Sequence, residues 1–168
     1  MPPEPTLPEF HRPLPLGTVG QGGRRLALEA TPAECAALAG RLDILGLASF
    51  AAALRLTPEE GGTILVEGRM AAQLTQACVV SLDPVEQALD VPVTFRLLPP
   101  GREPADGPDD LDEIESADGI ADLGEALAEL FALSLDPYPR ALAAELPAGA
   151  DGAVTGGFAA LAALRRKI

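Results

Sequence analysis

The fold is decided by residues 63–82, which read TILVEGRMAAQLTQACVVSL. Apolar residues recur at every second position between Met70 and Cys78, with only Gln76 breaking the apolar series on that face. Such an alternation is typical of a β-strand with one face buried. Gly68 interrupts the early part of the stretch, where we expect a bulge or a bend. The sequence thus predicts one long strand that ends at Pro84.

Three shorter stretches show the same period of two, at residues 24–30, 49–57 and 91–97. The connections between the later strands are too short to hold a crossover helix, which favours antiparallel pairing. Residues 13–19 are expected to add a short edge strand. We therefore expect residues 13–98 to form an antiparallel sheet or a small open β-barrel.

Two helices are predicted by their caps. Thr31 and Glu34 have the spacing of a capping box around Pro32, and apolar residues follow at helical spacing to about residue 42. Asp122 is a second N-cap, followed by a helix that should stop near residue 136, before Pro137. With this helix in a unit of residues 119–140 packed on the core, the fold class is α+β.

The charge of the chain is concentrated in one segment. The formal net charge is −13, and residues 101–136 hold twelve acidic residues against one arginine. This acidity argues against DNA binding and against RNA binding by the whole surface, because phosphate contacts need an excess of Lys and Arg. Residues 99–118 are too polar to fold alone, and we expect them to form a mobile acidic loop.

Both ends of the chain are expected to be flexible. Residues 1–12 are rich in proline and read as a mobile N-terminus. Residues 141–168 read as a flexible tail that closes with a short amphipathic segment. Its apolar stripe is Phe158, Leu161 and Leu164, and three bases follow, Arg165, Arg166 and Lys167.

No residue set indicates catalysis or cofactor binding. His11 is the only histidine, and we expect it to be a solvated loop residue. Cys35 and Cys78 read as small core residues in preference to reactive thiols. The dense carboxylates of residues 106–122 lack the spacing of a calcium loop, so a solvated linker is favoured and a docking surface for a basic partner is the alternative. We expect no enzyme activity, metal or cofactor.

The sequence also carries no membrane or export signal. No window holds eighteen consecutive apolar residues, and the N-terminus lacks the basic and apolar regions of a secretory signal. The two cysteines form no disulfide framework. We therefore expect a cytoplasmic protein without a membrane partner.

Three blocks, in this order, resemble the YceD-like family of large ribosomal RNA subunit accumulation proteins of bacteria and plastids. They are residues 66–82, residues 112–139 and residues 158–167. The positions that match the family pattern most directly are Gln76, Cys78, Asp122, Leu123, Pro137 and Pro139. Many members have a CxxC where this chain has residues 75–78, and a further Cys after the second helix. Only Cys78 remains here, as in an alphaproteobacterial type of member, and one thiolate cannot hold tetrahedral zinc.

The resemblance implies a non-enzymatic factor that supports 23S ribosomal RNA accumulation and assembly of the large ribosomal subunit. Its partners would be ribosomal proteins or the pre-ribosomal large-subunit particle, with at most weak or indirect RNA contact. A general protein-binding adaptor acting through the acidic segment is the alternative. The residues expected to bind partners are Asp109, Asp110, Asp112, Glu113, Phe158, Leu161, Leu164, Arg165, Arg166 and Lys167.

Overall fold

The computed structural model describes residues 8–104, 107 and 111–142. Its main sheet has five strands in the order β2-β3-β4-β5-β6, and β1 pairs with β7 in a separate two-stranded ribbon. The elements in chain order are β1 (Pro13–Pro15), β2 (Arg24–Glu29), α1 (Pro32–Arg41), β3 (Gly46–Pro58), β4 (Ile64–Ala77), β5 (Pro84–Leu98), β6 (Glu113–Glu115), β7 (Ile120–Asp122) and α2 (Leu123–Ser134).

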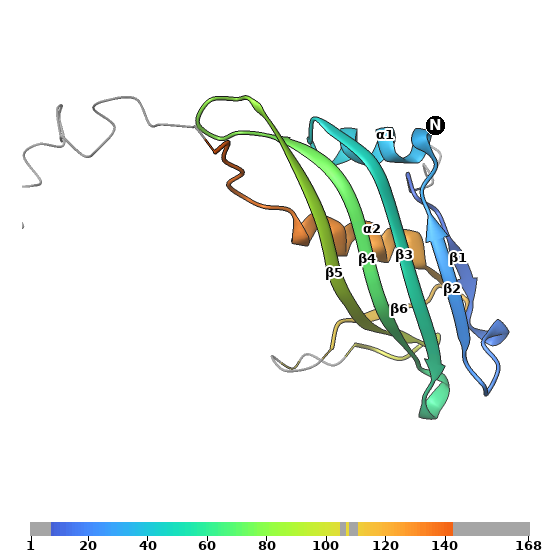
Figure 1. Ribbon diagram of the computed structural model, residues 1–168. Helices are drawn as coiled ribbons and strands as arrows, with labels where there is room; N and C mark the ends of the chain where they lie inside the picture. The colour runs from blue at the N-terminus through green and yellow to red at the C-terminus, as the bar shows by residue number, and fades with distance from the viewer. Residues whose placement is uncertain (1–7, 105–106, 108–110, 143–168) are drawn as a thin grey trace, which may run out of the picture.

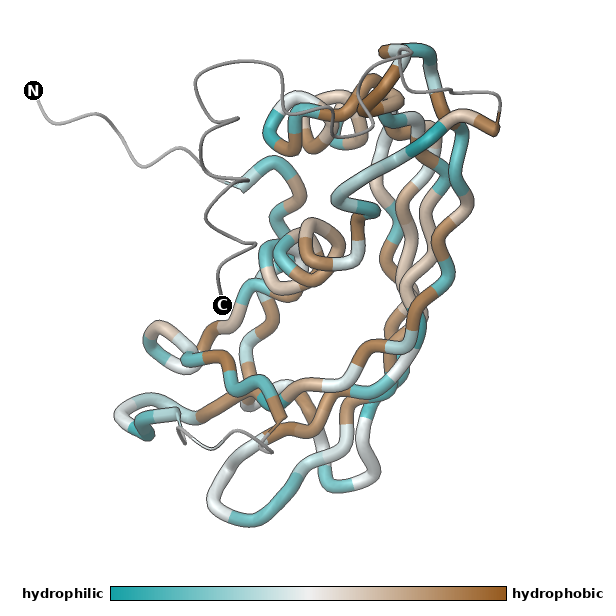
Figure 2. The backbone as a smooth tube through the Cα atoms, turned by 90° about the vertical axis from the view of Figure 1, so that its left-hand side faces the viewer, coloured by the Kyte–Doolittle hydropathy of each residue, from teal (hydrophilic) through white to brown (hydrophobic). Residues whose placement is uncertain are grey.

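The long strands curve around α2, which lies on the concave side of the sheet (Figures 1 and 2). The predicted alternation holds: the inward-facing Met70, Ala72 and Leu74 of β4 are buried, and the residues between them are exposed. Met70 lies opposite Ala52 of β3 and Val91 of β5. One face of the sheet is therefore the wall of the core, and the other faces outward.

Aromatic rings join the sheet to the helix. Phe50 of β3 packs at 5.3 Å from Phe10 and at 5.0 Å from Phe131 of α2, measured between ring centroids. All three rings are at most 1% exposed. The capping box of α1 forms as predicted, since Thr31 accepts from the Glu34 N–H and Glu34 accepts from the Thr31 N–H.

The α+β prediction is confirmed, and the sheet stays open instead of closing into a barrel. Its four long strands are antiparallel, but β6 pairs with β5 in parallel, which the sequence analysis did not predict. β4 ends at Ala77, so residues 78–83 are a turn. β5 already starts at Pro84. Within the described residues, its second edge pairs with β6 only over Arg96–Leu98, so Pro92 lies where that edge needs no backbone N–H donor.

Gly68 is not a bulge. It stays in regular register between Leu54 and Val93, and the irregularity of this sheet lies at Leu47/Ser49 of β3. A Cβ added to Gly68 would lie 2.1 Å from the Ala53 carbonyl oxygen. Glycine is needed here for the close approach of two backbones.

The prediction that all of residues 1–12 are mobile is wrong for the last of them. Phe10 is buried at 1% exposure, and His11 is half-buried against the side chain of Asp122 instead of being solvated. Arg12 donates its backbone N–H to the same carboxylate at 2.8 Å. The proline-rich neighbours of Phe10 predict a mobile segment. Its core contact, Phe50, lies 40 positions away in the sequence, so the local pattern does not show it.

Candidate functional site

The two hairpin turns of the long strands lie at opposite ends of the molecule (Figure 1). We call the end with the β3–β4 turn, residues 59–63, the acid end, because residues 99–118 also start and finish there. We call the end with the β4–β5 turn, residues 78–83, the exit end, because the chain leaves α2 beside it. Of the residues expected to bind partners, Asp112 and Glu113 lie at the acid end; Asp109, Asp110 and residues 158–167 lie outside the described residues.

The acidic segment is anchored to the sheet on both sides. At its start, the Arg102 guanidinium donates to the Thr63 hydroxyl at 3.0 Å. At its end, the Ser116 hydroxyl donates to the Leu98 carbonyl at 2.7 Å, and the Arg96 N–H donates to the Asp112 carbonyl. The interpretation of 99–118 as one loop is corrected here, because β6 lies inside it. These anchors fix where the acidic residues leave the sheet.

Carboxylates dominate the surface around this stem. Glu59, Glu60 and Glu113 line a hollow of about 520 Å³ together with Arg96 and Arg102. Both arginines are already engaged, since Arg96 pairs with Glu59 at 2.9 Å and Arg102 holds Thr63. The two bases that line this hollow are therefore held by their neighbours, and its carboxylates outnumber them by three to two.

At the exit end, residues that the family resemblance singled out meet in space. The Gln76 side-chain amide donates to the Asp136 carbonyl at 3.1 Å. The Val79 N–H donates to the Pro139 carbonyl at 2.9 Å, and Pro139 is buried. These two hydrogen bonds hold the end of β4 and the turn after it against the chain beyond α2, sixty residues later in the sequence.

Cys78 sits at the centre of this junction. Its sulfur accepts three backbone N–H groups, from Val80, Ser81 and Ala141, each at 3.4 Å. The Ser81 hydroxyl, with the N–H groups of Ser81 and Ala141, lowers the pKa of the thiol to about 6 against the opposing effect of burial. Cys78 is buried as predicted, but in a polar nest that favours the thiolate. Cys35 is an ordinary core thiol whose pKa is raised by burial.

A groove of about 550 Å³ opens beside this junction. We call it the exit groove. It lies between the end of α2, the end of β4 and the loop before β3, and its lining comprises Asp43, Gln76, Ala77, Val79, Ala132, Leu133, Leu135, Asp136, Pro137 and Pro139. The lining is largely apolar, and its two charged residues are both acids.

The other two family positions, Asp122 and Leu123, begin α2. Asp122 is the N-cap and accepts from the N–H groups of Gly124 and Glu125. Burial works to raise the pKa of its carboxyl, but the Arg12 N–H and the His11 ring outweigh this, and the pKa lies below its usual range. Leu123 is buried at 1%. This cluster ties the N-terminal segment to the helix and has a structural role.

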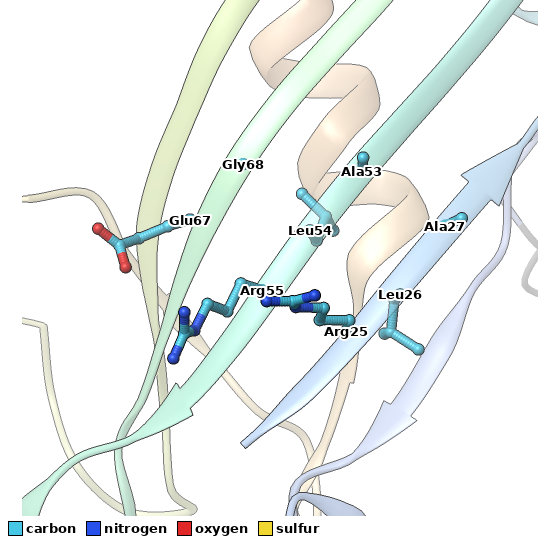
Figure 3. Close-up of a pocket in the computed structure, with 8 residues that line it drawn as sticks. All are labelled: Arg25, Leu26, Ala27, Ala53, Leu54, Arg55, Glu67 and Gly68. Carbon is cyan, nitrogen blue, oxygen red and sulfur yellow. The ribbon is translucent and has the colours of Figure 1, made fainter. Parts of the chain in front are cut away.

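The outward face of the sheet carries a third feature, a hollow of about 500 Å³. Arg25 of β2 and Arg55 of β3 lie directly opposite each other in the register, and Ala53 and Gly68 leave the space beside them open (Figure 3). Neither guanidinium has an ion-pair partner within 4 Å among the described residues. Like charges that face each other across strands are unfavourable. Glu67 of β4 lies opposite Arg55 on its other side and lines the same hollow, so two bases and one acid meet there and leave a net charge of +1.

A family model described as large ribosomal RNA subunit accumulation protein YceD matches residues 66–164, more than half of the chain. The chain belongs to the YceD family. No curated protein and no solved structure matches it significantly.

The family description names a role in accumulation of the large ribosomal RNA and no chemical reaction. The match to this YceD chain starts in β4 and includes the acid-end segment, the Cys78 junction and α2. Among the described residues, no three His, Cys, Asp or Glu side chains are grouped so as to hold a metal ion, and no helix is long and apolar enough to cross a membrane.

Sequence reasoning missed the exit groove and the nest around Cys78. Both are built from segments far apart in the chain: Ala141 reaches Cys78 across 63 positions. The signal that pointed to the junction was the shared membership of Gln76, Cys78 and Pro139 in one family pattern. That signal named the residues without showing that they touch.

Proposed function

We propose that this protein is a non-enzymatic cytoplasmic factor that supports accumulation of 23S ribosomal RNA and assembly of the large ribosomal subunit. The observation that carries the proposal is the family match over residues 66–164. We further propose that it acts by binding a basic ribosomal protein or a basic surface of the pre-ribosomal particle. Direct contact with RNA is then weak or indirect.

The acid end supports this choice of partner. Residues 99–118 hold eight acidic residues against one arginine, a net charge of −7, and the stem of this segment is held by Arg102 and Ser116, so these charges leave the sheet at one fixed place. Ribosomal proteins bind RNA through excess Lys and Arg, and an anchored cluster of carboxylates attracts such surfaces at long range. We propose Asp109, Asp110, Asp112 and Glu113 as the contact residues.

The hollow beside Arg25 and Arg55 is one place on the described surface where a phosphate could be held, and Glu67 in its lining opposes such binding. It is a small site in a chain of net charge −13, so it can add an RNA contact but cannot drive association alone. This arrangement fits a factor that binds the pre-ribosomal particle mainly through a protein surface.

The test is a deletion strain complemented with variants. Loss of the gene should lower 23S RNA and free large subunits and leave small subunits unchanged. The triple variant Asp109→Asn, Asp110→Asn, Asp112→Asn should fail to restore 23S RNA, because it removes three charges from the proposed contact surface.

The matched control is the triple variant Glu29→Gln, Glu86→Gln, Glu129→Gln, which removes the same charge from exposed positions elsewhere. It should complement fully. An unchanged subunit profile in the deletion strain would refute the ribosomal role. Equal behaviour of the two triple variants would refute the role of the acid end alone. A single non-ribosomal partner in a pull-down that resists moderate salt would favour the adaptor alternative.

A further inference from the structure

The described part of the chain exposes its large apolar side chains at one end. Leu133 is 83% exposed and lines the exit groove, and Tyr138, 72% exposed, lies between Pro137 and Pro139 of that lining. Among the described residues, the large hydrophobic side chains that are exposed all belong to the exit end except Ile120: Leu45, Val79, Leu82, Leu133, Tyr138 and Leu142. A gathered apolar surface of this kind on a monomer marks a place that another segment or partner covers.

The chain itself leaves from the edge of this surface. Ala141 donates its N–H to Cys78, which fixes the exit point, and Leu142 is the last described residue. Residues 143–157 then separate this point from the apolar stripe that begins at Phe158. A coil of that length has a root-mean-square span of about 20 Å, so the stripe is held close to the groove at an effective concentration of about 1 mM.

The stripe and the groove are complementary. Phe158, Leu161 and Leu164 share one face of a helix and span about 9 Å along its axis. The bases at residues 165–167 follow directly, and the charged residues of the groove are Asp43 and Asp136. Apolar contact in the groove and opposite charge at its rim therefore favour the same occupant.

We propose that residues 158–167 dock in the exit groove of their own molecule, as a short helix with its Phe158, Leu161 and Leu164 face inward. A helix of this length is marginal alone in water, so it forms by packing its apolar face. The docked segment covers the exit end, and a partner that uses this end must displace it. The inference does not depend on the ribosomal role.

Tyr138 provides a direct reporter. It is the only tyrosine in a chain without tryptophan, so the intrinsic fluorescence of the full-length protein comes from the exit end alone. Acrylamide, an uncharged quencher, should reach Tyr138 poorly when the segment is docked. With an effective concentration of about 1 mM and a dissociation constant of about 0.1 mM, roughly nine-tenths of the molecules are closed. Leu161→Asp should then raise the quenching constant about two- to threefold.

The matched control is Ala163→Asp, which adds the same charge on the opposite face of the segment and should leave quenching unchanged. On the groove side, Leu133→Asp changes an exposed residue and should raise quenching as Leu161→Asp does, with no further rise in the double variant. A synthetic peptide of residues 157–168 added to the Leu161→Asp protein should restore protection.

Equal quenching constants for the unaltered protein and Leu161→Asp would overturn the proposal. So would equal effects of Leu161→Asp and Ala163→Asp, because docking through the apolar face requires them to differ. Protection that appears only as protein concentration rises, together with a dimer mass in light scattering, would assign the groove to a second copy instead.

Discussion

The substitution Gly124→Ala tests how the N-terminal segment is joined to α2. A Cβ at residue 124 would lie 1.7 Å from the Phe10 carbonyl oxygen and 3.0 Å from the Arg12 nitrogen. Both are backbone atoms, so no side chain can rotate away. The chain over residues 10–12 must move, and the hydrogen bonds from the Arg12 N–H to Asp122 and from the Leu123 N–H to the Arg12 carbonyl would break.

The size of the effect follows from opposing contributions. Gly→Ala within a helix normally stabilises by up to about 1 kcal/mol. Overpacking costs about 1–3 kcal/mol, and each of the two lost hydrogen bonds costs about 1 kcal/mol. Displacing Phe10 from the core adds to this, so we expect a net loss of about 3 kcal/mol. For a chain of this size such a loss lowers Tm by about 6–12 °C.

Gly40→Ala is the control, because a Cβ at residue 40 meets nothing within 4 Å. It should leave Tm unchanged or raise it slightly. Urea unfolding followed by circular dichroism measures the free energy of unfolding of both variants, and thermal unfolding measures their Tm. If Gly124→Ala were as stable as Gly40→Ala, the packing of residues 10–12 on α2 would be refuted.

The remaining predictions concern titration and the sheet. The thiolate absorbance of Cys78 should appear with a midpoint near pH 6 and vanish in Cys78→Ser. Because the folded-state pKa of Cys78 lies below the ordinary 9.0, the free energy of unfolding should rise between pH 6 and pH 9. A free energy of unfolding that stays constant over this range would contradict the polar nest around Cys78. The Arg12 guanidinium lowers the pKa of Glu34 from 4.5 to about 2, so this contribution should be lost as the pH falls through that interval, and Glu34→Gln should remove that part of the acid unfolding profile. Arg25→Gln should stabilise the fold by about 0.2–1 kcal/mol in urea unfolding by relieving the charge pair while leaving Arg55 opposite Glu67, and destabilisation would argue against it. Gly68→Ala should lower Tm because its Cβ would meet backbone, and an unchanged Tm would count against that close approach.

The strands β2, β3 and β4, the second half of β5 and both helices could be predicted because their signals are local. The alternation of residues 70–78 and the caps at Thr31 and Asp122 each lie within a few positions of the element that they define. The buried face of β4 follows directly from that alternation.

The features that could not be predicted depend on distant contacts. The environment of His11 is set by Asp122, 111 positions away, and the strand β6 has only three residues and gains its place from pairing with β5. Proline at residue 84 reads as a stop, yet it opens β5, whose second edge is unpaired at this end among the described residues. The candidate site divides in the same way: the acidic charge is visible in composition, whereas the exit groove exists only after β4 and the end of α2 have met.

We propose that this YceD-family protein acts on the assembling large subunit through its acid end. A crosslinking map of the full-length protein on pre-ribosomal large-subunit particles tests it most directly. We predict crosslinks from residues 99–118 to lysine-rich ribosomal proteins, weakened by the Asp109→Asn, Asp110→Asn, Asp112→Asn variant. Crosslinks confined to non-ribosomal proteins, or none to the particle, would contradict the account.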